Sequence, residues 1–238
     1  MFNRLITFLY KNKILTEAQN GFRKGKCIET AVQSLNEIIQ EALDKGTREI
    51  GTFIDLTKAH DTLNHKVLLE KLTSYGIKGI TNLRFNSYLT NRRQYIEINQ
   101  SDSSNATVCR YRSSCMEIKQ DVPQWSVLGP LLFLLYINDL PFNIHGANLV
   151  MYADDINALI TDSDVCAFQT EIDRVIAELE IWFNLNDFII NVSKTGVMPF
   201  HNRQSKFPVK PQVSFNKLNL EYIDESKFLG IYITETLN

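Results

Sequence analysis

Apolar side chains recur every three or four residues in several stretches of the chain, the spacing that gathers them on one face of a helix. At the N-terminus this spacing joins Phe2, Leu5 and Leu9 and predicts a first helix. The longest such stripe covers 165–183 and predicts the clearest helix of the chain. The same reasoning predicts helices over 31–43, 66–75, 80–89 and 126–140.

Shorter apolar runs that are bounded by turn residues predict strands. They cover 49–56, 147–152 and 156–161, with a hairpin formed by 93–99 and 108–119 and short strands and turns after Phe188. A polar, glycine-containing stretch at 16–27 predicts a loop. Strands and helices are mixed irregularly, so the order favours an α+β fold, an antiparallel sheet packed on helices, over a series of parallel βαβ units.

The composition is that of a globular protein. The 238 residues are 44% hydrophobic and 22% charged, which excludes a disordered tail, a collagen-like repeat and a coiled-coil rod. The length suits one large domain or two small ones. The longest apolar run, 127–137, is too short to span a bilayer, which needs about 20 residues. We therefore interpret this run as part of the core.

Four cysteines, at positions 27, 109, 115 and 166, show no CxxC spacing. Their arrangement argues against a zinc site. The N-terminus has no secretory signal sequence, so the pattern predicts reduced thiols in an intracellular protein. It does not distinguish the nucleus from the cytoplasm.

Charge is distributed unevenly along the chain, although the formal net charge is only −2. Residues 1–26 carry six basic groups and one acid, a net charge of +5, whereas 141–200 carry nine acids and two bases, a net charge of −7. The near-neutral sum argues against a surface that coats nucleic acid everywhere, but it allows a basic groove beside a local acidic site. Most acids at 164–180 are expected on the solvent face of the long helix.

Three acids remain that a solvated helix face does not explain. Asp55 ends an apolar strand, and Asp154 and Asp155 lie in a tight connection between two apolar strands. In an antiparallel sheet these carboxylates can converge, and their repulsion would then require divalent cations, with Mg²⁺ favoured by hard oxygen ligands. Two such ions about 3.5–4 Å apart can drive in-line displacement at phosphorus. The alternative is a plain hairpin turn, in which aspartate is common.

Six sequence segments occur in an order that resembles one enzyme family. They are NGFRKGKCIETA, FIDLTKAHDTLNH, VPQWSVLGPLLFLLYINDLP, LVMYADD, NVSKT and KFLGIYI. From residue 5 or so to its end, the chain resembles the reverse transcriptases of non-LTR (LINE-like) retrotransposons. The resemblance implies a right-hand polymerase with partial fingers at 1–46 and a palm at 47–238. The palm would carry an inserted fingers hairpin near 91–120 and a primer-supporting hairpin at its C-terminal end, without the family's thumb and endonuclease.

The activity that this resemblance implies is RNA-directed DNA polymerisation, in which a nucleotide is transferred to a primer 3′-hydroxyl. The implied partners are an RNA template, a DNA primer and deoxynucleoside triphosphates, without a membrane. The family's motifs make Asp55 and Asp154 the ligands that bridge two Mg²⁺ ions, or Mn²⁺ in their place, with Asp155 as a supporting ligand. One ion would lower the pKa of the primer hydroxyl, and the other would hold the triphosphate and the leaving pyrophosphate.

The resemblance also assigns Leu56, His60, Gln124 and Trp125 to the incoming nucleotide. The family has an aromatic residue where His60 stands, which stacks under the sugar and excludes a 2′-hydroxyl. The smaller, polar imidazole predicts poorer discrimination against ribonucleotides, and an ordinary tolerated histidine is the alternative. The family has glycine where Trp125 and Asp121 stand, and glycine permits unusual dihedral angles and close backbone approach. These two departures count against nucleotide binding.

Lysine and arginine residues supply the remaining expected charges of the site. Lys194 matches a lysine beside the active site with a role as general acid toward pyrophosphate, and a solvated lysine is the alternative. Arg23, Lys24 and Lys26 match the fingers region, where phosphate contacts give sequence-independent binding. Solvated loop lysines are the alternative for Lys24 and Lys26.

The segment Phe228, Leu229, Gly230 matches the hairpin that supports the primer end in the family. Phe228 and Leu229 are expected to pack rather than to touch the primer.

Two other functions stay open at this point. One is a degenerate, catalytically inactive fragment that keeps the palm fold and at most binds nucleic acid, and the other is an RNA-binding module of an intron maturase or telomerase type.

Overall fold

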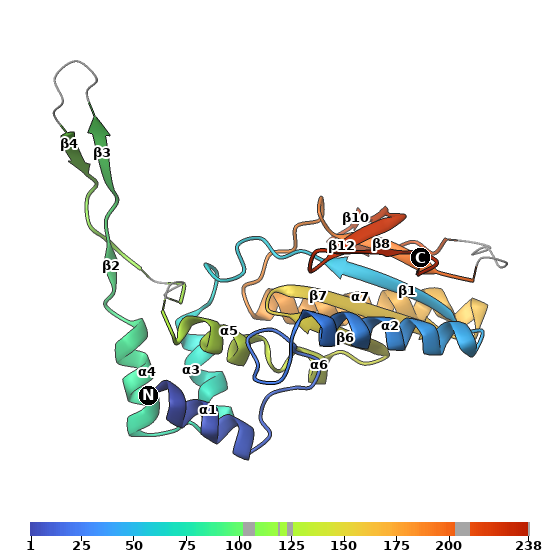
Figure 1. Ribbon diagram of the computed structural model, residues 1–238, viewed down its shortest axis with the longest axis horizontal. Coiled ribbons are helices and arrows are strands. Elements are labelled where there is room, and N and C mark those ends of the chain that lie inside the picture. The colour runs from blue at the N-terminus through green and yellow to red at the C-terminus, as the bar shows by residue number, and fades with distance from the viewer. Residues whose placement is uncertain (102–107, 119, 123–125, 203–209, 238) are drawn as a thin grey trace.

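The computed structural model describes residues 1–101, 108–118, 120–122, 126–202 and 210–237. Its centre is a five-stranded sheet with the order β11-β8-β1-β7-β6 (Figure 1). The strands are β1 (Arg48–Ile54), β6 (Ala147–Tyr152), β7 (Asp155–Asp162), β8 (Gly196–Phe200) and β11 (Glu221–Tyr222). The neighbours pair antiparallel, except that the short β11 runs parallel to β8.

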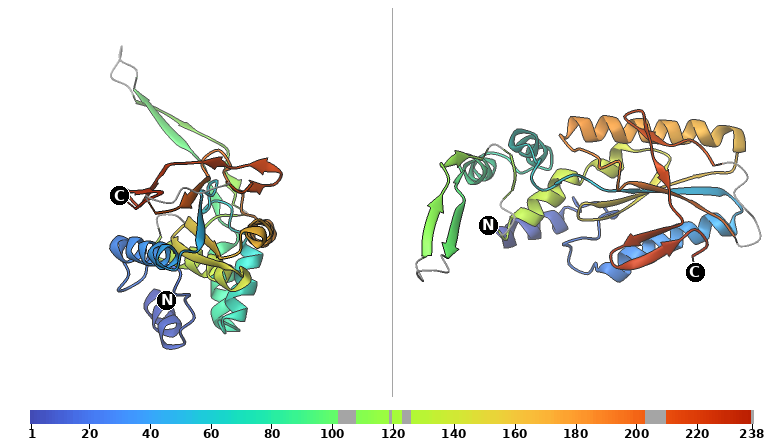
Figure 2. Two further views of the ribbon diagram at one scale, coloured as in Figure 1. Left: turned by 90° about the vertical axis from the view of Figure 1, so that its right-hand side faces the viewer. Right: turned by 90° about the horizontal axis from the view of Figure 1, so that it is seen from above.

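Helices cover both faces of this sheet because its central strands are apolar on both sides. Helix α2 (Ile28–Asp44) lies along one face and α7 (Val165–Leu185) along the other, with the sheet between them (Figure 2, right). Along β1 the side chain of Phe53 packs in the cluster that contains α2 residues, while Ile50 and Ile54 pack in the cluster that contains α7 residues. This alternation is the period-two pattern of a strand that is buried on both faces.

Helix α5 (Gly129–Ile137) is apolar all round, and all its residues from Leu131 to Ile137 are buried. It is surrounded by α1 (Phe2–Lys11), α3 (His65–Ser74) and α4 (Ile80–Leu89), which form the lower part of Figure 1. Pro130 stands in its first turn, where a missing N–H costs nothing. The helix predicted over 126–140 is therefore confirmed in a shorter form, followed by the single turn α6 (Leu140–Asn143).

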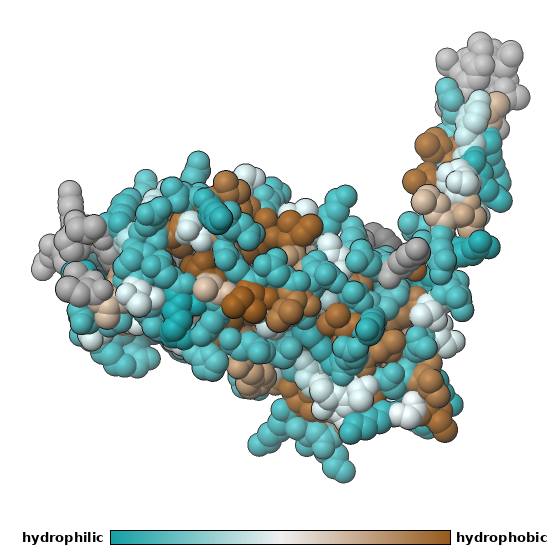
Figure 3. All heavy atoms as spheres, turned by 180° about the vertical axis from the view of Figure 1, so that it is seen from behind, coloured by the Kyte–Doolittle hydropathy of each residue, from teal (hydrophilic) through white to brown (hydrophobic). Residues whose placement is uncertain are grey.

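A β-ribbon projects from the body of the molecule at the end of α4 (Figure 1). It is built from β2 (Arg93–Gln94), β3 (Glu97–Ser101), β4 (Val108–Arg112) and β5 (Met116–Glu117), which pair as two short antiparallel ladders. The hairpin predicted at 93–99 and 108–119 is thus confirmed for its described residues. Several large apolar side chains of the ribbon, including Ile96 and Ile98, are exposed, and Figure 3 shows hydrophobic atoms on it.

The C-terminal part forms two further hairpins, as predicted after Phe188. The first pairs β9 (Ser214–Phe215) with β10 (Leu218–Asn219), and the second pairs β12 (Glu225–Phe228) with β13 (Ile231–Thr234). Together with α2, the second hairpin covers the face of the sheet on which Phe53 lies, since Phe228 and Ile233 belong to the same cluster. The fold is therefore a mixture of helices and mostly antiparallel strands, as predicted. No helix in the described ranges has the length and apolar character needed to cross a bilayer.

Candidate active site

The three aspartates that the sequence singled out lie at one end of the central sheet. Asp55 directly follows the last residue of β1, Asp154 lies in the turn between β6 and β7, and Asp155 begins β7. Strands β1 and β7 are neighbours, with Ile54 opposite Ile156. One step further along this register, Asp55 comes beside Asp155. In Figure 1 the arrow of β1 ends on the side from which the ribbon projects.

The charges of these carboxyl groups influence one another. Burial and, to a smaller extent, the neighbouring carboxylates of Asp154 and Asp55 together raise the pKa of Asp155 to about 6. Like charges at short range disfavour the ionised form. The strand register brings Asp55 beside Asp155, whereas the convergence of all three carboxylates on one site stays a prediction.

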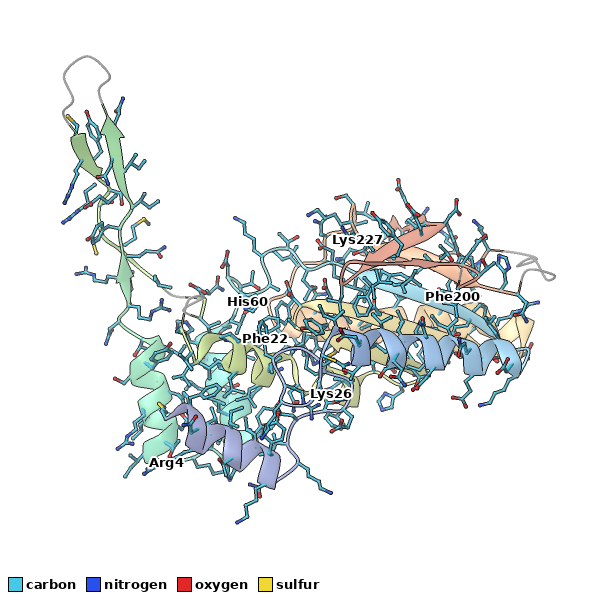
Figure 4. All side chains as sticks on the ribbon, viewed as in Figure 1. Arg4, Phe22, Lys26, His60, Phe200 and Lys227 are labelled. Atoms are coloured by element: carbon cyan, nitrogen blue, oxygen red, sulfur yellow. The ribbon has the colours of Figure 1, made fainter. Side chains whose placement is uncertain are left out.

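His60 lies within electrostatic reach of Asp154 and Asp61. Its half-buried imidazole has a lowered pKa because burial disfavours the charged ring, although the charge of Asp154 acts in the opposite direction. The ring is tilted by 32° against Phe133 of α5, with ring centroids 4.1 Å apart. In Figure 4 it lies between the sheet and α5. His60 therefore lies near Asp154 and is held by an aromatic contact, and its place under a nucleotide sugar stays a prediction.

The donor chemistry of this cluster fits a divalent cation. Carboxylate oxygens are hard ligands, and a cation would relieve the repulsion that raises the pKa of Asp155. Within the described ranges, however, no three His, Cys, Asp or Glu side chains stand together as a ready-made coordination group. A bound ion would have to draw the carboxylates of Asp55, Asp154 and Asp155 closer together.

A turn formed by 191–195 is fastened to the backbone of Asp55. The Asn191 N–H donates to the Asp55 carbonyl oxygen at 2.8 Å, and the Asp55 N–H donates to the Thr195 hydroxyl at 3.2 Å. The same hydroxyl donates to the Asn191 carbonyl oxygen at 3.0 Å. Lys194 lies in this turn with its side chain exposed, and its role toward pyrophosphate stays a prediction. Sequence reasoning missed Asn191 and Thr195.

The expected phosphate contact through Arg23 does not agree with its surroundings. Its side chain is only 7% exposed, and it donates to the carbonyl oxygens of Thr16 and Gln19 and pairs with Glu17. Lys26 also pairs with Glu17, at 3.2 Å. Both side chains bind within their own loop. The Arg23 guanidinium has several donors for loop carbonyl groups, and the Lys26 ammonium also donates to the Glu17 carbonyl oxygen. Lys24 is exposed and is the residue of this group that stays accessible to a phosphate.

One of the expected nucleotide contacts also does not agree with the structure. Leu56 is 7% exposed and packs in the core, so its side chain does not face a ligand. Gln124 and Trp125 lie outside the described residues. Asp121, three positions before Gln124, has a φ of 95°, a backbone conformation that suits glycine. Its carbonyl oxygen is 2.8 Å from Nε2 of His65.

The segment from Phe228 to Gly230 forms the turn of the second C-terminal hairpin. Leu229 and Gly230 both have positive φ, of 52° and 89°, which suits a two-residue hairpin turn. Phe228 is 3% exposed and packs against the sheet, and Leu229 packs against the same cluster. The expectation that these two side chains pack is confirmed, whereas the contact with a primer stays a prediction.

Two polar residues after α5 have structural roles that the sequence did not reveal. Asn138 accepts a hydrogen bond from the Thr16 N–H and donates to the Ile14 carbonyl oxygen, which joins the end of α5 to the segment after α1. Asp139 pairs with the half-buried Lys71 of α3 at 2.5 Å. The acids of α7 were expected on its solvent face, and on this face Glu171 and Glu178 form surface ion pairs with Arg174.

Comparison with known proteins places these motifs in a family. Residues 1–233 match the family described as reverse transcriptase (RNA-dependent DNA polymerase). The probable RNA-directed DNA polymerase from transposon BS of Drosophila melanogaster is 28% identical over an alignment of 249 positions, which covers 99% of this chain and 25% of that protein. The RNA-directed DNA polymerase from the mobile element jockey of the same species is 25% identical, with the same coverage. The chain spans about a quarter of the length of these curated relatives.

Solved structures with a similar fold come from telomerases. The apo telomerase of Candida tropicalis aligns with a TM-score of 0.61 at 12% identity, over all of this chain and 40% of that one. The same enzyme in complex with a fragment of telomeric RNA aligns with a TM-score of 0.55, over all of this chain and 36% of that one. At this identity the likeness shows the fold alone. The family match, by contrast, covers nearly the whole sequence, so the chain belongs to the reverse transcriptase (RNA-dependent DNA polymerase) family.

Proposed function

We propose that this chain is the part of a non-LTR retrotransposon enzyme that transfers nucleotides to a primer 3′-hydroxyl on an RNA template. The observation that carries the proposal is the cluster of Asp55, Asp154 and Asp155 at one end of the sheet, each in its family motif. Residues 1–46 would form partial fingers and 47–238 the palm, with the projecting ribbon as the inserted fingers hairpin. The proposed partners are an RNA template, a DNA primer and deoxynucleoside triphosphates.

The mechanism assigns a role to each residue near the cluster. Asp55 and Asp154 would hold two Mg²⁺ ions with support from Asp155, and the bound ions would supply Lewis acidity at the hydroxyl and at the pyrophosphate. Lys194 lies in the turn that is hydrogen-bonded to Asp55. Its ammonium group donates a proton to the leaving pyrophosphate or stabilises its negative charge. His60 forms the floor under the sugar, supported by Phe133. Lys24 contacts a nucleic-acid phosphate from the edge of the 16–27 loop.

Primer extension on an RNA template tests this proposal. The protein should add deoxynucleotides in the presence of Mg²⁺, and Asp55→Asn should lower kcat by at least about 1,000-fold, because the site loses a charged oxygen ligand. Asp44→Asn, which removes an exposed carboxylate at the end of α2, is the control and should leave the rate unchanged. Extension by Asp55→Asn at the rate of the control would refute the assigned site.

Asp121 supports a second candidate, a relict that keeps the fold but has lost catalysis. A residue other than glycine at a φ of 95° indicates that the segment before Gln124 has drifted from the family pattern. The combined reversion Asp121→Gly, Trp125→Gly and His60→Phe separates the two candidates. Extension by the reverted protein alone would favour the relict, and equal extension by both proteins would exclude it.

A further inference from the structure

Gln19 is a buried amide that joins the N-terminal loop to the turn that carries the aspartates. Its side chain is 2% exposed, and its Nε2 donates to the Ala153 carbonyl oxygen at 3.1 Å. Its Oε1 accepts from the Ala153 N–H at 2.9 Å and from the Gly21 N–H at 2.8 Å. One side chain thus satisfies both backbone polar groups of the residue directly before Asp154, across 134 positions of sequence.

Backbone hydrogen bonds hold Gln19 in this place. The Met151 N–H donates to the Ala18 carbonyl oxygen and the Asn20 N–H donates to the Met151 carbonyl oxygen, both at 2.8 Å. Gln19 itself forms a parallel bridge with Met151. Residues 18–20 therefore run along the outer side of β6 as a minimal extra strand. Past the end of β6, the side-chain amide of Gln19 takes the place of a backbone partner for Ala153 in the described part of the chain.

Gly21 packs against the same turn from the next position along the loop. A Cβ atom at Gly21 would overlap the backbone nitrogen of Ala153, so the two backbones approach more closely than any side chain allows. Ala153 itself has a φ of 55°, in the left-handed region that alanine rarely adopts. The turn is thus held in an unfavourable conformation by contacts from outside it.

The position of Asp154 and Asp155 depends on this conformation. The strand register places Asp155 beside Asp55, so like charges lie close together, and a turn that was free to relax would move them apart. An amide suits the restraint because it offers a donor and an acceptor side by side and adds no charge to the acidic cluster. A shorter asparagine would not reach, and a glutamate would lack the donor.

We propose that Gln19 is a positioning residue for nucleotidyl transfer, which sets the backbone of the turn so that Asp154 and Asp155 meet Asp55. This role rests on the proposed function, and it does not require Gln19 to touch a substrate. Gly21 acts with it, because the close approach of the loop places the amide within reach of both polar groups of Ala153.

The substitution Gln19→Met tests this role. Methionine keeps the length of the side chain and removes the three hydrogen bonds that the Gln19 amide forms with Ala153 and Gly21. The N–H of Ala153 should exchange with solvent at least about tenfold faster, because it loses its acceptor. The affinity for Mn²⁺ should fall about tenfold, and kcat of primer extension about 100-fold, with little change in KM for the nucleotide. Gly21→Ala should shift all three quantities in the same direction.

The control is Asn82→Met, which also removes side-chain hydrogen bonds to backbone, but between α3 and α4. The Asn82 amide donates to the carbonyl oxygens of Leu69 and Ile77, at 3.0 and 3.2 Å. It should lower thermal stability without changing Mn²⁺ affinity or kcat at temperatures well below unfolding. A purely structural role for Gln19 would make Gln19→Met behave like this control.

The readouts separate failure of this inference from failure of the proposed function. An inactive wild-type protein would count against the polymerase, and the Mn²⁺ affinity would then decide the role of Gln19. Unchanged exchange at Ala153 in Gln19→Met, or an unchanged Mn²⁺ affinity, would overturn the inference. A loss of kcat no larger than that of Asn82→Met in an active protein would overturn it as well.

Discussion

At the scale of single residues, burial and backbone conformation single out two acids. Glu49, the second residue of β1, is fully buried, and neither of its carboxyl oxygens has a hydrogen-bond partner among the described residues. Burial raises its pKa from 4.5 to about 8, because the low-polarity surroundings disfavour the charge. Asp121 combines a φ of 95° with a carboxyl oxygen that lacks a partner in the described part of the chain.

The free energy of unfolding should therefore depend on pH through Glu49. Between pH 4.5 and pH 8 the unfolded chain has lost this proton while the folded protein keeps it. The contribution of Glu49 is fully present below pH 4.5 and is lost as the pH rises to 8, by up to about 1.4 kcal/mol per pH unit. Urea unfolding of Glu49→Gln at several pH values should show a stability advantage over wild type that grows with pH. A constant difference would contradict the assignment.

Relief of backbone strain at Asp121 should stabilise the protein. Asp121→Gly should raise the free energy of unfolding by about 1 kcal/mol, since glycine adopts positive φ without a steric cost. Asp121→Ala removes the same carboxyl group and keeps the strain, so it should gain less. Chemical denaturation of both variants at one pH measures the difference. Equal gains would show that the buried carboxyl group, rather than the backbone, is the cause.

At the scale of elements, the site is assembled by turns that hold the ends of strands. The 191–195 turn fixes the backbone of Asp55, and the N-terminal loop fixes the backbone before Asp154. Each attachment uses a buried polar side chain, Thr195 or Gln19, against the main chain of a strand end. Among the described residues, these attachments use the backbone beside the acids and not their carboxylates.

Loss of the Thr195 hydroxyl should weaken this attachment. Thr195→Val keeps the shape of the buried side chain but leaves the Asp55 N–H without its acceptor, and an unsatisfied buried donor costs about 1–3 kcal/mol. We expect that loss in the free energy of unfolding, measured in urea. Thr7→Val in α1 removes an exposed hydroxyl that also bonds a carbonyl oxygen and should cost less than about 0.5 kcal/mol. An equal loss in the free energy of unfolding at both positions would show that the Thr195 hydroxyl does not stabilise the backbone of Asp55.

At the scale of the whole molecule, the helices and strands follow the periodicity of the sequence closely. Helix α4 has the predicted limits, and β1, β6 and β7 lie within about two residues of theirs, because apolar spacing directly reflects burial. The inward direction of Arg23 and the contacts of Gln19 and Thr195 were not predictable. They depend on partners from distant segments, such as Ala153, whose proximity only the folded chain creates.

The central claim is that the aspartates at the end of the sheet hold divalent cations. Titration of the protein with Mn²⁺, followed by electron paramagnetic resonance, measures this most directly. Asp154→Asn should bind at least about tenfold more weakly than wild type, because one charged oxygen ligand is lost. The control Asp44→Asn should bind as wild type does. Equal affinities of wild type and Asp154→Asn would contradict the claim.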